Sequence, residues 1–237
     1  MRDTITIPFH GENSLIIASD NSGAIGMKEN DFVHVPYEMV AYYSFRVAAM
    51  ECIAAGGDPI SVVLHNFCGN EPWDELVFGI QKGIEELCLK DVSITGSTES
   101  NFPLLQSALG LMVLGKKTNG ITAELEFHEQ LKYAVIGIPL VGNEVIEQLD
   151  RVAPLSVFKE VSLLNEMLIW PVGSKGILYE MNQIFPNKKF SQDTIITDLD
   201  ILKSSGPATC FITVYHHSQE ELLKKIAGSY FHSVRVV

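Results

Sequence analysis

The chain has 237 residues, of which 46% are hydrophobic, and a formal net charge of −12. A chain of this length forms one large domain or two modest ones and can bury a sizeable core. The acidic balance and the scattered Lys and Arg residues argue against a nucleic-acid-binding surface. No segment has the apolar run of a signal peptide or a membrane span, so we expect a soluble cytoplasmic protein.

The cysteines, Cys52, Cys68, Cys88 and Cys210, show no Cys-x-x-Cys spacing. The positions of the cysteines therefore give no zinc-binding signature and no reason to expect disulfides. All four are predicted to be buried as small hydrophobic side chains.

Apolar runs and helical periodicity predict the elements of the first half of the chain. The predicted strands are residues 15–19, 60–64, 92–95 and 104–114, and the predicted helices are residues 37–55 and 74–88. Residues 116–120 are interpreted as a linker. The strands 15–19 and 92–95 are each followed by a polar segment that contains glycine.

The second half has a less regular pattern. Its predicted strands are residues 133–138, 209–215 and 234–237, and its predicted helices are 143–150, 157–167, 177–184 and 219–226. Helices and strands are mixed without strict alternation. We therefore predict an α+β protein with two domains, residues 1–118 and 119–237.

The first candidate site is the segment from Asp20 to Gly26, which also contains Gly23. Glycines let backbone N–H groups approach an anion, and an aspartate at a strand end can hold a cation. A plain β-turn is the alternative interpretation.

The second candidate is the helix and turn at residues 48–59. Glu51 is a carboxylate inside an apolar stripe of small residues, and isolating a charge there is costly unless a cation or hydrogen bonds satisfy it. Asp58 follows in a Gly-Gly-Asp-Pro turn. A partly exposed glutamate in an ion pair is the alternative for Glu51.

The third candidate is residues 94–100, where Gly96, Ser97 and Thr98 precede Glu99. Hydroxyls and free amides after a strand suit phosphate or Mg²⁺ ligation, although a helix N-cap or polar loop has the same composition. His65, at the end of the strand 60–64, is a further candidate to face a substrate. A hydrogen-bonding pair with the next residue is equally compatible with its position.

Taken in order, these segments resemble the superfamily of aminoimidazole ribonucleotide (AIR) synthase, thiamine-monophosphate kinase, selenophosphate synthetase and the hydrogenase-maturation ATPases. In that superfamily a strand ends in an Asp-containing turn, as at Asp20. A helix then carries an acidic residue before Ala-Met-Gly-Ala-x-Pro, as from Glu51 to Pro59. A later strand ends in Gly-Gly-Asp-Thr, similar to residues 95–98, and a second-half Asp-x-Ser-Asp-Gly-Gly-Leu turn resembles residues 172–177.

The resemblance implies an N-terminal domain that pairs with its copy in a homodimer, and an ATP- and Mg²⁺-dependent activity on a small molecule. By analogy, Asp20, Glu51 and Glu99 would hold Mg²⁺. The backbone at Gly23, Gly26 and residues 96–98 would hold phosphates. Asp20, Asp58 and His65 are the candidates for a general base.

The chain departs from the superfamily pattern at four aspartate positions. Glu51 stands in place of the helix Asp, Ser97 replaces the Asp of Gly-Gly-Asp-Thr, and the turn at residues 172–177 lacks both of its aspartates. The compact chain best resembles α-ribazole kinase of cobalamin salvage, which phosphorylates a nucleoside. The expected activity is therefore that of a small-molecule kinase. A non-catalytic nucleotide-binding scaffold and an ATP-dependent ligase or cyclase are the alternatives.

Overall fold

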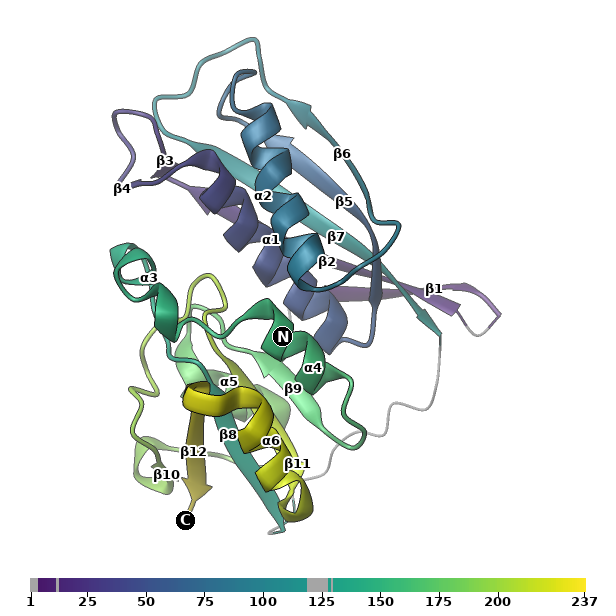
Figure 1. Cartoon of the computed structure of the whole chain (residues 1–237), viewed down its shortest axis with the longest axis vertical. Helices are drawn as coiled ribbons and strands as arrows, with labels where there is room; N and C mark the ends of the chain where they lie inside the picture. Colours follow the sequence, from purple (N-terminus) through teal and green to yellow (C-terminus); the bar gives the residue numbers. More distant parts are fainter. Residues whose placement is uncertain (1–3, 12, 119–127, 129) are drawn as a thin grey trace. The chain divides into compact units, whose positions relative to one another are not determined.

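The computed structural model describes residues 4–11, 13–118, 128 and 130–237. The chain divides into two compact units, residues 2–121 and residues 122–237, and Figure 1 shows the order of elements in each. Each unit combines one main sheet with helices, which confirms the predicted α+β class.

The N-terminal unit contains a five-stranded sheet in the order β1-β2-β7-β5-β6. Its strands are β1 (Thr4–His10), β2 (Asn13–Gly23), β5 (Asp58–Asn66), β6 (Ser93–Thr98) and β7 (Ala108–Thr118). Only β5 and β6 run parallel within this sheet. A separate parallel pair joins β3 (Ile25–Gly26) to β4 (Val33–His34).

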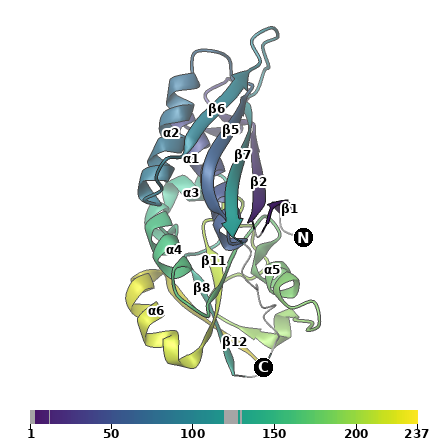
Figure 2. The same ribbon diagram turned by 90° about the vertical axis from the view of Figure 1, so that its right-hand side faces the viewer.

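Two helices, α1 (Tyr37–Ala54) and α2 (Trp73–Glu86), cover one face of this sheet (Figure 2). Alternate strand residues turn towards them, so that Ile16, Leu64 and Leu111 are almost fully buried. The helices approach each other closely where α2 carries glycine. A Cβ atom at Gly79 would overlap the backbone of Glu38, so the glycine permits this packing.

Several strands extend beyond their predicted ends. β2 continues through Asp20 to Gly23, because each of these residues pairs with β7. β6 likewise continues to Thr98 along β5. The predicted turn at Asp20 and the predicted stop at Gly96 were therefore wrong. The predicted linker was also wrong at its start, since β7 runs to Thr118; its last two residues lie outside the described part of the chain.

The C-terminal unit contains a second five-stranded sheet, in the order β10-β12-β8-β11-β9, with all neighbours antiparallel. Its strands are β8 (Leu131–Ile136), β9 (Leu168–Pro171), β10 (Ile195–Ile196), β11 (Phe211–His216) and β12 (Phe231–Val236). Its helices are α3 (Asn143–Glu147), α4 (Leu155–Ser162), α5 (Gly176–Ile184) and α6 (Glu220–Ala227). Four 3-10 turns occur at Leu149–Arg151, Gln192–Thr194, His217–Gln219 and Gly228–Tyr230.

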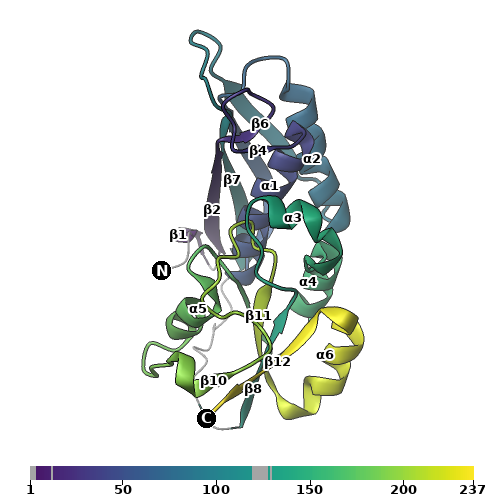
Figure 3. The same cartoon turned by 90° about the vertical axis from the view of Figure 1, so that its left-hand side faces the viewer.

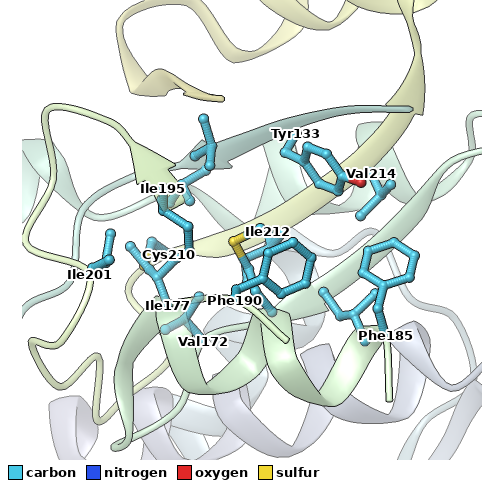
Figure 4. Packing of buried hydrophobic residues seen from close by; sticks show 14 of the residues in the cluster. Tyr133, Val172, Ile177, Phe185, Phe190, Ile195, Ile201, Cys210, Ile212 and Val214 are labelled. Carbon is cyan, nitrogen blue, oxygen red and sulfur yellow. The ribbon is translucent and has the colours of Figure 1, made fainter. Parts of the chain in front are cut away.

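Within this unit, α5 lies on one face of the sheet and α3, α4 and α6 lie on the other (Figure 3). The core beneath α5 is shown in Figure 4, where the Tyr133 ring meets Phe185 edge-on at 6.0 Å between centroids. On the opposite face, Phe158 meets Phe211 in the same way at 5.0 Å. Apolar side chains therefore fill both sides of the second sheet.

Predictions for the second half were correct in order and less accurate in extent. The helix predicted at 157–167 ends at Ser162, and a strand that was not predicted, β9, follows it. Glu166, just before that strand, has a positive φ of 56°, which ends any helix. All four cysteines are free, but Cys88 is exposed, contrary to prediction.

Candidate functional site

Two of the three predicted polar segments lie at the same end of the N-terminal sheet. Strand pairing places Asp20 beside Leu111, Leu111 beside Leu64, and Leu64 beside Gly96. Strands in a sheet lie about 4.8 Å apart, so Asp20 and Gly96 are roughly 14 Å apart along this row. The ends of β2 and β6, far apart in the sequence, therefore belong to one region.

The residues of this region point to two different faces. On β2, Ala18 is buried beneath the helices and Asp20, two residues further on, shares that face. His65 is exposed between buried Leu64 and Asn66, so it points to the opposite face, together with its register partner Ser97. The structure therefore separates Asp20 from His65, which the sequence had grouped as candidate bases.

Asp58 lies at the other end of the sheet. It is the first residue of β5 and pairs with Lys116, whereas Leu64, in the row of Asp20, lies six residues further along β5. At about 3.3 Å per residue this separation is roughly 20 Å. Asp58 is exposed there and does not join the region around Asp20.

Glu51 is half-buried on α1, and its Oε2 atom is fully covered. The helix starts at the Asp20 end of the sheet, where the Tyr37 hydroxyl lies 3.0 Å from Ser107 Oγ. It ends at the Asp58 end, where Cys52 packs against Gly115. Glu51 is therefore in the helix layer, on the covered side of the sheet, and nearer to the Asp58 end.

The three predicted phosphate-binding glycines differ in what surrounds them. A Cβ atom at Gly23 would meet no other atom within 4 Å, so the backbone is approachable there. Gly26 has a φ of 153° and packs against Ser107, and Gly96 packs against the Leu64 carbonyl and the Trp73 ring. Close packing thus explains the glycines at 26 and 96 without a ligand, while Gly23 remains open.

Glu99 already has a local role. Its Oε1 accepts hydrogen bonds from the Asn101 N–H at 2.6 Å and the Phe102 N–H at 3.2 Å. Within the described residues, no group of three His, Cys, Asp or Glu side chains is placed to hold a metal ion. Asp20, Glu51 and Glu99 therefore do not form a ready-made cluster.

Sequence reasoning missed the buried carboxylate of Asp31, which is 5% exposed. It accepts hydrogen bonds from Ser107 N–H at 2.7 Å, Ser107 Oγ at 2.7 Å and Lys28 N–H at 2.9 Å. Burial alone would raise its pKa, but these hydrogen bonds keep the pKa below the usual value. No spacing or motif around Asp31 marks it, because its partner Ser107 is distant in the sequence.

Asn66 is a second residue that sequence reasoning undervalued. Its side-chain amide donates to the Gly69 carbonyl at 2.7 Å and to Thr98 Oγ1 at 3.1 Å, and its Oδ1 accepts from Cys68 N–H at 2.8 Å. Lys28 Nζ also bridges two loops by donating to the Phe67 and Leu104 carbonyls. The loops around the Asp20 end are thus held together by specific hydrogen bonds.

A buried cation also lies in the helix layer. Arg46 on α1 is fully buried. Sequence reasoning missed it, although a charged residue in an apolar helix is as clear a signal at Arg46 as at Glu51. Burial raises the pKa of Tyr42, whose hydroxyl donates to Glu86 Oε2 at 2.6 Å, and the Arg46 charge partly opposes that rise.

The C-terminal turn at residues 172–177 contributes no carboxylate. Val172, where the resemblance places aspartate, is fully buried in the core cluster under α5. Lys175, at the other aspartate position, lies over the Tyr179 ring with Nζ 4.4 Å from its centroid. Gly176 has a φ of 80° and packs against Leu202, which accounts for the glycine in this turn without a bound ion.

The likeness of the chain to solved structures shows the AIR synthase-like fold. Among solved structures, the chain is similar to the hydrogenase maturation protein HypE in complex with ATP, with a TM-score of 0.62 and 11% identity over 98% of this chain and 79% of that chain. It is also similar to thiamine-monophosphate kinase (ThiL) from Aquifex aeolicus, with a TM-score of 0.62 and 10% identity over 99% and 88%. A complex of AaThiL with AMPPCP and TMP gives a TM-score of 0.59 and 11% identity over 99% and 84%.

Sequence comparison adds nothing to this likeness, since no family model matches the chain and no curated protein matches it. In the described part of the chain, no helix has the length and apolar character needed to cross a membrane.

Proposed function

We propose that this protein is an ATP- and Mg²⁺-dependent small-molecule kinase that acts in the cytoplasm. The observation that carries the proposal is that Asp20, the open backbone of Gly23 and residues 96–98 lie at the same end of the N-terminal sheet, with β7 and β5 between them. Structures of the same fold have been solved with ATP and with AMPPCP, which supports nucleotide binding. This end of the sheet is the proposed location of the phosphates.

The residues at this end fit Mg²⁺ bound together with a nucleotide. Mg²⁺ is commonly held by one or two carboxylates plus substrate phosphates, so a three-carboxylate cluster is not required. Asp20 would be the carboxylate that holds the ion at the phosphate end. Glu51 lies nearer the Asp58 end of α1, so its placement does not support the role of second ligand. When bound, the ion would neutralise phosphate charge. Glu99 is the weakest of the three, because its Oε1 already accepts two backbone hydrogen bonds.

The residues of the chain would act mainly by positioning and charge. Phosphoryl transfer needs an aligned acceptor and stabilised phosphate oxygens more than a strong base. Backbone N–H groups near Gly23 and the Thr98 hydroxyl would orient the phosphates, and Asp20 would receive the acceptor proton. Among the three candidate bases, Asp58 lies at the far end of the sheet and His65 points to the other face, which favours Asp20.

For the acceptor, we propose a nucleoside such as α-ribazole, in cobalamin salvage. This choice rests on the resemblance of the compact chain to α-ribazole kinase. The kinase class itself has broader support, because thiamine-monophosphate kinase is among the structures with this fold.

Calorimetry with Mg·ATP, followed by measurement of ADP release with a panel of nucleosides, tests the proposal. A kinase binds Mg·ATP and releases ADP only when its acceptor is present. Absence of Mg·ATP binding would contradict the proposal. Release of ADP and phosphate without a phosphorylated product would indicate a ligase or cyclase instead.

A non-catalytic nucleotide-binding scaffold is the second candidate, and it has its own supporting observation. Ser97, Val172 and Lys175 occupy positions where the resemblance places aspartate, and Val172 is buried in the core. Tight Mg·ATP binding without turnover on any acceptor would favour this candidate over the kinase.

We also propose that the N-terminal unit forms a homodimer through the sheet face that α1 and α2 leave uncovered (Figure 2). Ile5 and Ile7 of β1 are 56% and 40% exposed, and their register partners Ile17 and Leu15 lie on the same face. An extended apolar face of this kind is typical of an interaction surface.

The substitution Ile17→Glu is expected to convert the dimer to a monomer, because it places a charge in the middle of this apolar face. Sedimentation velocity would show the change in mass. Phe78→Glu, which introduces the same charge at an exposed apolar position on α2, is the matched control and should remain dimeric. A wild-type protein that sediments as a monomer would contradict the dimer.

A further inference from the structure

The C-terminal unit contains an open cavity of about 430 Å³ on the β10–β12 side of its sheet. It is lined by two segments, residues 196–198 and the strand β12. Along β12, Phe231, Ser233 and Arg235 share one face of the strand, and His232 points to the other. Figure 1 shows β10 and β12 next to each other in this part of the fold. The lining is mixed, with an aromatic ring, two hydroxyls, an imidazole, a carboxylate and a guanidinium.

Asp198 and His232 form a fixed pair in this cavity. His232 Nδ1 lies 2.9 Å from Asp198 Oδ2, and the His232 side chain is only 12% exposed. Since an ionised carboxylate can only accept, Nδ1 donates, and Nε2 remains as the second polar atom of the ring. Burial tends to raise the pKa of Asp198, but the hydrogen bond and charge of His232 lower it. The negative charge of Asp198 is thus already engaged by the imidazole.

Arg235 also lines the cavity, and it differs from His232 because it is not paired with a carboxylate of the described residues. The structure gives it no ion pair with any described carboxylate, and its side chain is exposed at the cavity. The nearby Lys224, by contrast, pairs with Glu220 at 2.7 Å. In a chain with a net charge of −12, an unpaired guanidinium beside a cavity is available to bind an anion.

The lining of the cavity holds further donors besides this guanidinium. Thr197 and Ser233 contribute hydroxyl groups to the lining. β10 pairs only with Arg235 and Val236 of β12, so in the described chain no strand covers residues 231–234 on that side. Every second residue of an uncovered strand directs its N–H outward, which adds main-chain donors at the cavity.

We infer that this cavity binds the phosphate group of a small phosphorylated molecule. A guanidinium, two hydroxyls and main-chain amides match the several acceptor oxygens of a phosphate better than the two oxygens of a carboxylate. The Phe231 ring would contact an apolar part of the same molecule. This site is separate from the proposed nucleotide site, and the inference does not depend on the kinase proposal.

The test is a calorimetric titration of the 237-residue chain with inorganic phosphate, in the presence of saturating AMPPCP to occupy any nucleotide site. Arg235→Gln is expected to weaken phosphate binding by about tenfold or more, the size of one lost charge-assisted hydrogen bond. Arg235→Lys should retain part of the affinity. Arg151→Gln, which removes the same charge from another exposed position of this unit, is the matched control and should bind as the wild type does.

Failure of the wild type to bind phosphate would overturn the inference, as would equal binding by Arg235→Gln or an equal loss in Arg151→Gln. Acetate at the same concentration should not displace phosphate, and equal displacement would contradict a phosphate site. Because phosphate binding is measured whether or not AMPPCP binds, a failure of the kinase proposal remains distinguishable from a failure of this one.

Discussion

The substitution Asp20→Asn is expected to reduce ATP-dependent turnover by a factor on the order of 10²–10³, while the protein remains folded. The change removes a negative charge at the proposed phosphate end, where electrostatic stabilisation of the transferred group is needed. Asparagine has nearly the same shape, and the backbone of residue 20 would still pair with Leu111. Steady-state measurement of ADP release, together with urea unfolding, checks both parts of this expectation.

Asp91→Asn is a suitable control for that experiment. Asp91 is an exposed aspartate of the same unit with a φ of 57°, a conformation that asparagine also tolerates. It should behave as the wild type does in both measurements. Full activity of Asp20→Asn would remove Asp20 from the mechanism, and a large loss of stability would show that the residue is structural.

The largest expected effect on stability comes from Asp31→Ala. This substitution removes the acceptor of three hydrogen bonds and leaves the Ser107 N–H buried without that partner. Hydrogen bonds to a charged group contribute about 1.5–3 kcal/mol each, but they are not additive, so we expect a loss of about 3 kcal/mol. Urea unfolding at neutral pH measures it. Glu29→Ala, an exposed neighbour on the same loop, should change the free energy of unfolding by less than about 0.5 kcal/mol.

The Asp31 contribution should also depend on pH, with a defined sign. Its pKa in the folded protein is below the value of about 3.9 expected in the unfolded chain. The carboxylate therefore stabilises the fold fully above that unfolded value, and the contribution falls as the pH drops through the folded-state pKa. The stability difference between wild type and Asp31→Asn should shrink between neutral pH and about pH 3. A difference that is constant with pH would contradict the account.

Local sequence patterns were sufficient for much of the fold. The helix predicted at 37–55 matches α1 to within one residue, because its apolar spacing and the preceding Pro36 both mark a helix. Strand ends were predicted less well at polar residues. Asp20 and Ser97 look like turn residues in the sequence, yet pairing with β7 and β5 extends both strands through them.

The candidate site depends on information that a linear pattern does not contain. The opposite faces of Asp20 and His65 follow from strand register, and the remote position of Asp58 follows from strand direction. Two of the three hydrogen bonds that Asp31 accepts come from Ser107, which follows it by 76 residues. A charged residue in an apolar helix is a usable signal. The reasoning that selected Glu51 on this ground would also have selected Arg46.

Mass spectrometry of the products tests the central claim most directly. The wild-type protein would be incubated with ATP, Mg²⁺ and a panel of nucleosides and vitamin precursors, with a parallel sample of Asp20→Asn. The account predicts that one acceptor, of the α-ribazole type, gains a single phosphoryl group in the wild-type sample and not in the variant. ATP that is bound without any phosphorylated acceptor, across the whole panel, would contradict the assignment as a kinase.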